Sequence, residues 1–372
     1  MNVNIDRAAL LATVNRATSV APSASPMEAM RGVLLLEDPG GNALTVCSTN
    51  TEVGLEERIP CQTQGDDAVV VNARLLVGML ERLPGQTINL NRNRGSNQLL
   101  LQSGQTSYLI SVGERSSFPR MEIPFPEDTV KVAGIPSMAK RTVFAASIEK
   151  SKPLLRCVNL MFTRDGLRAA GSNGQCIVTA KGDDKSTGNV SLLIPAQSLD
   201  KLASMVTDSD EFRVGTTGTN IVFLKENFTF SARLMEGGYV DTDQLVGSLK
   251  NQFTVLTDIG EMHRALRSAA SVEADGKVKL NFSGNAMTFT CTGIFGSACA
   301  DLEVTALRGV PHGEYWYGTR HLLSCLRALS GTVTLGVAQG GILTLSTQDA
   351  FYLQTPMRGA AEAKPEPAKK AA

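Results

Sequence analysis

The chain has 372 residues and no net formal charge, with 36 Lys and Arg against 36 Asp and Glu. This balance excludes a globally basic nucleic-acid binder but allows a locally basic face. The sequence has no apolar run of about 18 residues, which excludes a hydrophobic membrane-spanning helix. Its first residues lack the charged-then-apolar pattern of a signal peptide. We therefore expect a cytoplasmic protein that does not associate with a membrane.

The residue types that carry most catalytic and metal chemistry are few and scattered. The seven cysteines form no C-x-x-C pair, which indicates reduced thiols in the core or on the surface. No two of the three histidines, His263, His312 and His321, have the spacing of metal ligands. Nucleophile-elbow, phosphate-loop and dinucleotide motifs do not occur. We therefore expect no enzyme activity, no metal and no cofactor. An enzyme of unknown type would need a site that the sequence does not display.

An amphipathic helix recurs three times, and its copies align at Ala73, Gln197 and His321 in two steps of 124 residues. Three such repeats use nearly the whole chain and predict three domains. The last segment consists of Ala, Glu, Lys and Pro after one Gly, so it can bury almost nothing. The expected organisation is domain one at 1–125, domain two at 126–249, domain three at 250–358 and a disordered tail at 359–372.

Each repeat also begins with a helix, for which Asp6, Ser137 and Asp258 are the expected N-caps. Turn-forming residues then separate period-two segments, which predicts β-hairpins. The fold class is therefore expected to be α+β, with two helices packed on antiparallel sheet in each repeat. The six expected helices span 4–20, 72–84, 136–152, 196–206, 258–271 and 318–330.

Basic residues concentrate on these helices. Their Lys, Arg, Asp and Glu sum to +7, which leaves −7 for the rest of the neutral chain. A phosphate-facing surface needs such helices, although solvated helix faces with acidic loops elsewhere explain the same numbers. Few aromatic residues accompany the cations, which disfavours stacking on single strands. The residues expected to face DNA are Arg7, Arg74, Arg82, Lys140, Arg141, Lys150, Lys152, Lys201, Arg264, Arg320 and Arg327.

Four local segments, in order and at consistent spacing, resemble those of the bacterial DNA polymerase processivity clamp, the beta sliding clamp of DNA polymerase III. The segments are Ser48–Gly54, Gly113–Pro119, Leu167–Gly174 and Tyr352–Arg358. The threefold helix–strand–helix–strand pattern is similar to the same family, and the resemblance covers residues 1–358.

The resemblance implies a ring-forming fold of three repeated DNA-clamp domains. Two copies would join head to tail, with helices lining the hole and sheets forming the outer wall. The ring would encircle double-stranded DNA without reading its sequence and would tether the replicative polymerase, as a non-catalytic processivity subunit in DNA replication. The alternative is a paralogue of the clamp that stays monomeric and sequesters clamp-binding partners.

The resemblance also implies an apolar cleft that accepts short peptides from DNA polymerase, the clamp loader and repair factors. Its residues by position are Leu155, Cys157, Ser172, Gly174, Gln175, Cys176, Ile177, Val240, Leu245, Leu353, Pro356, Met357 and Arg358. The dimer edge would bring Tyr108 and Ile110 of one copy to Ser271 and Val272 of the other. Asn173–Ile177 stands where the family has Asp-Gly-His-Arg-Leu, which places the usual partner specificity in question.

Overall fold

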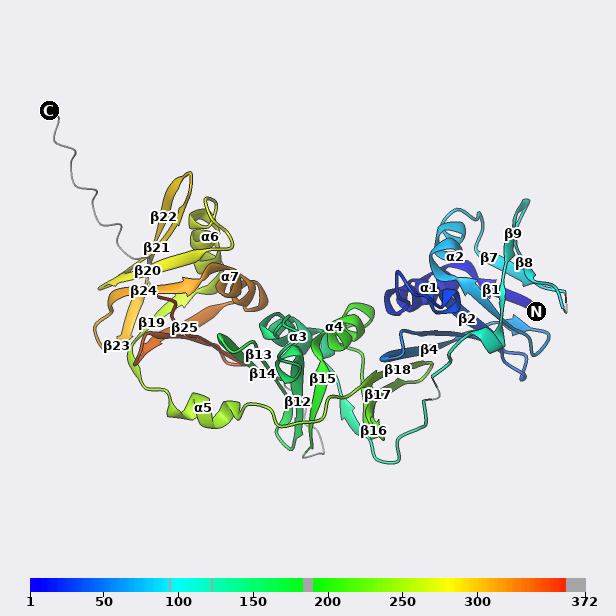
Figure 1. The fold of residues 1–372 in the computed structure, drawn as a ribbon, viewed down its shortest axis with the longest axis horizontal. Coiled ribbons are helices and arrows are strands. Elements are labelled where there is room, and N and C mark those ends of the chain that lie inside the picture. Colours follow the sequence, from blue (N-terminus) through cyan, green and yellow to red (C-terminus); the bar gives the residue numbers. More distant parts are fainter. Residues whose placement is uncertain (94, 122, 183–189, 359–372) are drawn as a thin grey trace. The chain divides into compact units, whose positions relative to one another are not determined.

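The computed structural model describes residues 1–93, 95–121, 123–182 and 190–358 (Figure 1). The chain divides into two compact units. The first unit comprises residues 1–139, 157–168 and 182–238, and the second comprises 140–156, 169–181 and 239 onward. The boundaries of the three expected domains stay a prediction. The tail expected at 359–372 lies outside the described residues. Within those residues, no helix is both long and apolar enough to cross a membrane.

Helix α1 (Arg7–Val20) and helix α6 (Ile259–Ala269) begin where the capping residues predicted. The carboxylates of Asp6 and Asp258 accept hydrogen bonds from the backbone N–H groups of Ala9 and Glu261, at 2.8 and 3.0 Å. Each bond satisfies one of the free N–H donors of a first helical turn. Both helices bury an apolar stripe at helical spacing, as expected.

The repeating helix of the sequence corresponds to α2 (Ala73–Leu80), α4 (Ala196–Met205) and α7 (Thr319–Ala328). These helices start at positions 73, 196 and 319, in successive steps of 123 residues. The side chain of Asn72 caps α2 by accepting from the N–H of Leu75 at 3.0 Å. The repeat found in the sequence is therefore a repeat of secondary structure.

The helix expected over 136–152 is wrong in its bounds. Helix α3 spans Ile135–Thr142, a 3₁₀ turn follows at Val143–Ala145, and residues 146–149 have no helical conformation. Ser137 lies inside α3 instead of capping it, and its N–H and hydroxyl both donate to the Asp208 carboxylate. The β-branched pair Thr142 and Val143 and the proline at 153 disfavour a continued helix. Ile148, within the range of the expected helix, is 86 % exposed.

The first unit contains two antiparallel sheets. One has the order β5-β1-β7-β8-β9 and the other β10-β6-β2-β3-β4-β18-β17-β16-β11. Strands β12 and β15 pair antiparallel in the same unit. The strands are β1 (Asn2–Asp6), β2 (Gly32–Glu37), β3 (Ala43–Thr49), β4 (Val53–Pro60), β5 (Gln62–Thr63), β6 (Ala68–Asn72), β7 (Thr87–Asn91), β8 (Gln98–Ser103), β9 (Thr106–Ser111), β10 (Gly113–Glu114), β11 (Val130–Val132), β12 (Cys157–Thr163), β15 (Val190–Pro195), β16 (Phe212–Thr217), β17 (Asn220–Lys225) and β18 (Phe228–Arg233).

The second unit has a four-stranded sheet of order β22-β21-β20-β24 and the strand run β14-β27-β26-β25-β19-β23. Strand β13 (Gly166–Ser172) begins in the first unit and ends in the second. The other strands are β14 (Cys176–Lys181), β19 (Asn251–Asp258), β20 (Lys277–Ser283), β21 (Ala286–Gly293), β22 (Gly296–Glu303), β23 (Thr305–Arg308), β24 (His312–Gly318), β25 (Thr332–Ala338), β26 (Ile342–Ser346) and β27 (Ala350–Gln354). A core that includes Phe253, Phe282, Phe289, Tyr317 and Tyr352 lies between these sheets and helices.

The α+β class with helices on antiparallel sheets is confirmed, and so are the hairpins β2–β3 and β20–β21. Strands β1 and β19, which lead directly into α1 and α6, were not predicted from the sequence. Helix α5 (Thr242–Ser248) was not predicted either. Short 3₁₀ turns at Glu28–Arg31, Arg115–Ser117 and Leu154–Arg156 complete the described elements.

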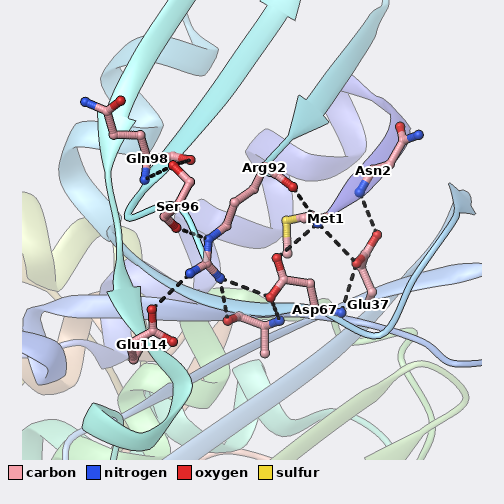
Figure 2. A network of polar contacts seen from close by, with 9 residues as sticks. Met1, Asn2, Glu37, Asp67, Arg92, Ser96, Gln98 and Glu114 are labelled. Carbon is pink, nitrogen blue, oxygen red and sulfur yellow. Dashed lines mark hydrogen bonds and ion pairs between the residues drawn. The ribbon is translucent and has the colours of Figure 1, made fainter. Parts of the chain in front are cut away.

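A buried ionic network holds the first strand of the first unit in place (Figure 2). The Arg92 side chain, 4 % exposed, pairs with Asp67 and Glu114, both at 3.0 Å. The Met1 ammonium pairs with Asp67 at 3.0 Å and donates to the carbonyl of Arg92, also at 3.0 Å. Burial tends to raise the pKa of Asp67, but the bonds from the Met1 ammonium and the Ala68 N–H and the charge of Arg92 outweigh it and lower that pKa. The network joins β1 to the end of β7 and to β6.

Replacing Arg92 by Leu should lower the free energy of unfolding by about 1–3 kcal/mol, because it removes the charge-assisted hydrogen bonds of a buried guanidinium while Asp67 keeps the Met1 ammonium. Urea denaturation of the two proteins measures this difference. The exposed Arg164, replaced by Leu, is the matched control and should change stability by less than about 0.5 kcal/mol. Equal effects of the two substitutions would contradict a structural role for the network.

Candidate functional site

Helix α6 presents two arginines on the side opposite its buried stripe. Met262, Leu266 and Ala269 are fully buried, whereas Arg264 and Arg267 are exposed. The two arginines are three residues apart and so lie on neighbouring turns of one face. Because packing occupies the apolar stripe, the cations can point only away from the sheet.

Helix α7 packs beside α6 and has the same construction. Leu322, Cys325 and Leu326 are buried, and Arg320 and Arg327 are exposed. Seven residues separate the two arginines, which is about two helical turns or roughly 10 Å along the axis. The pair of helices therefore carries four exposed guanidinium groups.

Burial and the positive potential of these helices lower the pKa values of their two histidines. Burial lowers the pKa of His263, and the charges of Arg327 and Arg267 lower it further. Burial also lowers the pKa of His321, with Arg320 adding to the shift. Arg327 of α7 thus acts on His263 of α6, which indicates that the arginines of the two helices share one electrostatic environment. Arg267 was missing from the expected DNA-facing set, although its spacing from Arg264 could have indicated it.

The cations expected to face DNA in the first unit differ in their exposure and in their hydrogen bonds. Arg74 and Arg82 are exposed, and the Arg82 guanidinium donates to the carbonyl of Gly78. Arg7 donates to the carbonyls of Gly85 and Leu80 at 2.9 and 3.2 Å, so its guanidinium is partly engaged at the end of α2. Lys201 of α4 is half-buried, and this burial lowers its pKa.

Of the four expected cations at 140–152, two lie on α3 and two lie beyond its end at Thr142. Lys140 is exposed on α3, and Arg141 pairs with Asp349 at 3.0 Å. Lys150 and Lys152 lie in the irregular segment beyond α3, which corrects their assignment to a helix face. Lys152 is also paired with Glu149 at 2.9 Å.

The structure brings several of the expected peptide-binding residues together where β14 pairs with β27. Ile177 lies opposite Leu353 in this pairing. The N–H of Thr355 donates to the carbonyl of Gln175 at 2.9 Å, which holds the irregular segment after β27 against the turn before β14. A Cβ atom on Gly174 would lie 3.8 Å from the side chain of Leu155, so this turn also meets the segment after α3.

Burial divides the expected cleft residues into two groups. Cys157, Ser172, Cys176, Ile177 and Leu353 are buried, and their part in a peptide-binding cleft stays a prediction. Cys176 and Ile177 are consecutive on β14 and both are buried, so both faces of this strand are covered at that end. The accessible members are Leu155, Gly174, Gln175, Val240, Leu245, Pro356, Met357 and Arg358.

Met357 is the most prominent accessible apolar member near β24. Its backbone N–H donates to the carbonyl of Trp316 at 2.7 Å, and its side chain is 37 % exposed. The carbonyl of Arg358 accepts from the Lys277 ammonium at 2.8 Å. Val240 is 37 % exposed just before α5, whose side-chain cap is Asp241, and Leu245 is half-buried on α5.

The residues expected at the dimer edge also differ in exposure. Tyr108 is half-buried on β9, whereas Ile110 is 4 % exposed and belongs to the core, and the role of both at a dimer edge stays a prediction. Leu109, on the other face of the same strand, is 61 % exposed. Ser271 is exposed and Val272 half-buried in the loop after α6. Among the described side chains, no three His, Cys, Asp or Glu groups lie close enough to hold a metal ion.

Comparison with solved structures shows the same fold in known clamps. The chain matches the DNA polymerase sliding clamp of Bacillus subtilis with a TM-score of 0.86 and 17 % identity, covering 97 % of this chain and 100 % of that one. It matches the DNA polymerase III subunit beta of Pseudomonas aeruginosa with a TM-score of 0.85 and 20 % identity, covering 96 % and 100 %. These likenesses place the chain in the class of proteins with the DNA-clamp fold.

Family models define the class more closely. The model of the N-terminal domain of the DNA polymerase III beta subunit matches residues 1–122, and that of its central domain matches residues 129–241. The beta sliding clamp of Staphylococcus epidermidis is 24 % identical over 251 residues, which is 64 % of this chain and 66 % of that relative's length. The chain belongs to the DNA polymerase III beta subunit family.

The electrostatic coupling of α6 and α7 can be tested residue by residue. Replacing Arg327 by Gln removes a nearby positive charge and should raise the pKa of His263, without changing that of His321. Replacing Arg320 by Gln should do the reverse. An NMR titration of the histidine ring protons measures both pKa values in both variants. Unchanged values in the two variants would show that these arginines lie too far away or are fully screened.

Proposed function

We propose that this chain is a DNA sliding clamp that encircles duplex DNA as a ring-shaped homodimer and tethers the replicative polymerase. The observation that carries the proposal is the face of α6 and α7 in a chain of this family. Four exposed arginines lie on that face, opposite the side that packs on the sheet. The clamp would have no catalysis of its own, and it would act in the cytoplasm, where bacterial DNA is replicated.

The chemistry of this face suits phosphates better than bases. Guanidinium groups form charge-assisted hydrogen bonds with phosphate oxygens, and such contacts carry no sequence information. Helix faces with few aromatic side chains offer little to stack on. Contacts of this kind would let the ring hold duplex DNA weakly and move along it.

Two free sheet edges support a head-to-tail dimer. Strand β9 is the last strand of the five-stranded sheet, and β22 is the first strand of the four-stranded sheet. Each therefore presents one row of backbone groups that has no partner strand within its sheet. An antiparallel pairing of β9 from one copy with β22 from the other would satisfy both rows.

The partner site we propose is the accessible surface around Leu155, Gly174, Pro356 and Met357. Exposed apolar side chains beside strand ends can accept an extended hydrophobic peptide. DNA polymerase, the clamp loader and repair factors would bind there through short peptide motifs. The exposed Arg358 could pair with an acidic residue of such a peptide.

Loading the protein onto nicked circular DNA with the host's clamp loader tests the ring directly. Retention on the circle through gel filtration, and loss after the circle is cut, is the expected result because the linkage is topological. Direct DNA affinity should fall as arginines 264, 267, 320 and 327 are replaced by Gln, with the salt slope reduced by about 0.9 per lost phosphate contact. The exposed Arg308, replaced by Gln, is the control. Equal retention on linear DNA, or a stable monomer that is never retained, would contradict the proposal and favour the sequestering paralogue.

Replacing Met357 by Ser should weaken binding of the host polymerase's clamp-binding peptide roughly tenfold, as expected for loss of one central apolar contact. Fluorescence anisotropy with a labelled peptide measures the dissociation constant. Leu307, 52 % exposed on β23, is the matched control and should tolerate the same replacement. Tight binding to both variants would place the partner site elsewhere.

A further inference from the structure

The tip of the β21–β22 hairpin carries the two most exposed large apolar side chains of the described residues. Ile294 is 90 % exposed and Phe295 is 93 % exposed. The strands pair up to Gly293 and Gly296, so these two residues form the whole connection. Figure 1 shows the hairpin as a projecting part of its own unit.

The turn itself does not require these residues. Two-residue hairpin turns favour Asn, Asp or Gly, because their central positions have positive φ. Among the described non-glycine residues only Thr51 has positive φ, so the tip is built with negative φ at both positions. Isoleucine and phenylalanine are disfavoured at this site for two reasons: the turn prefers other residues, and their apolar side chains are exposed to water. Conflicts of this kind tend to mark functional positions.

The base of the tip lies against the loop after α6. A Cβ atom on Gly293 would lie 2.5 Å from the carbonyl oxygen of Val272 and 3.3 Å from the Cβ of Glu273. Glycine is therefore needed for this close approach. The apolar tip is thus continuous with Ser271 and Val272, the loop expected at the dimer edge.

Strand β22, which starts at the tip, has a free edge that another strand can pair with. Residues 296–303 contain no Pro, Lys or Arg, and their two charged residues, Asp301 and Glu303, lie at the end of the strand away from the tip. Small residues at 297–300 would let another strand come close. A free edge that ends in an exposed Phe invites association unless a specific partner covers it.

We propose that Ile294 and Phe295 are the apolar anchor of the homodimer and dock on the first unit of a second copy of this chain. This inference rests on the proposed ring. The complementary edge is β9, and the first unit also exposes Leu109 on β9, at 61 %, and Leu75 on α2, at 47 %. Burial of one Phe covers on the order of 150–250 Å², against about 800 Å² on each partner of a standard interface. The tip therefore supplies a large share of the apolar contact.

The test replaces both tip residues by Ser and measures the dimer dissociation constant by analytical ultracentrifugation. The exposed side chains contribute little within one copy, so the variant should keep the circular dichroism spectrum and melting temperature of the unchanged protein. The dissociation constant should rise about a hundredfold, since each large side chain contributes at least about tenfold when buried. Val310, 73 % exposed in the same unit, is replaced by Ser as the control and should leave the constant unchanged.

The outcomes separate this inference from the proposed function. A dimer whose dissociation constant is the same with and without the tip residues overturns the anchor and leaves the ring standing. A protein that is monomeric at micromolar concentration overturns the homodimer and the anchor together. Binding of the unchanged protein to vesicles of phosphatidylglycerol and phosphatidylethanolamine, lost in the tip variant while the dimer is unaffected, would assign the tip to a membrane and overturn the anchor.

Discussion

The burial of apolar helix stripes against antiparallel sheets is the constraint on which the rest of the structure depends. Once Met262 and Leu266 of α6 and Leu322 and Leu326 of α7 enter the core, the directions of Arg264, Arg267, Arg320 and Arg327 follow. The apolar contacts stabilise each unit, and the same contacts determine which side the cations occupy. The packing of the apolar stripes on the sheets therefore forms the core and also orients the arginines of the basic face.

The two free sheet edges are a second consequence of the same architecture. Open antiparallel sheets must end somewhere, and β9 and β22 are where two of them end. Most proteins protect such edges with charge, proline or a covering segment. Here the half of β22 next to the apolar tip has only small, uncharged residues, and Asp301 and Glu303 lie in its other half, which agrees with a second copy covering the part near the tip. The free edge of β22, which would otherwise favour aggregation, is then the surface through which the proposed ring forms.

Charge pairing within the chain reduces what the formal charge count suggests. Of the cations expected to face DNA, Arg141 is paired with Asp349, Lys152 with Glu149, and Arg7 with backbone carbonyls. On α6 and α7, Arg264 pairs with the exposed Glu261 at 3.8 Å, whereas Arg267, Arg320 and Arg327 help to lower the pKa values of neighbouring histidines. Counting charge along a helix identifies a basic surface, but only the partners of each side chain show how much of it is free.

The sequence by itself determined the repeat, the hairpins, the caps of α1 and α6 and the family resemblance, because these depend on local periodicity, turn chemistry and ordered motifs. It did not determine the bounds of α3, since Ser137 contacts Asp208 from within the first turn, and Thr142, Val143 and a later proline act together at the other end. It also could not separate buried from accessible residues around β14 and β27. Cys176, Ile177 and Leu353 resembled surface contacts until strand pairing placed them in the core. Exposure is decided by neighbours distant in the chain, which only the tertiary structure supplies.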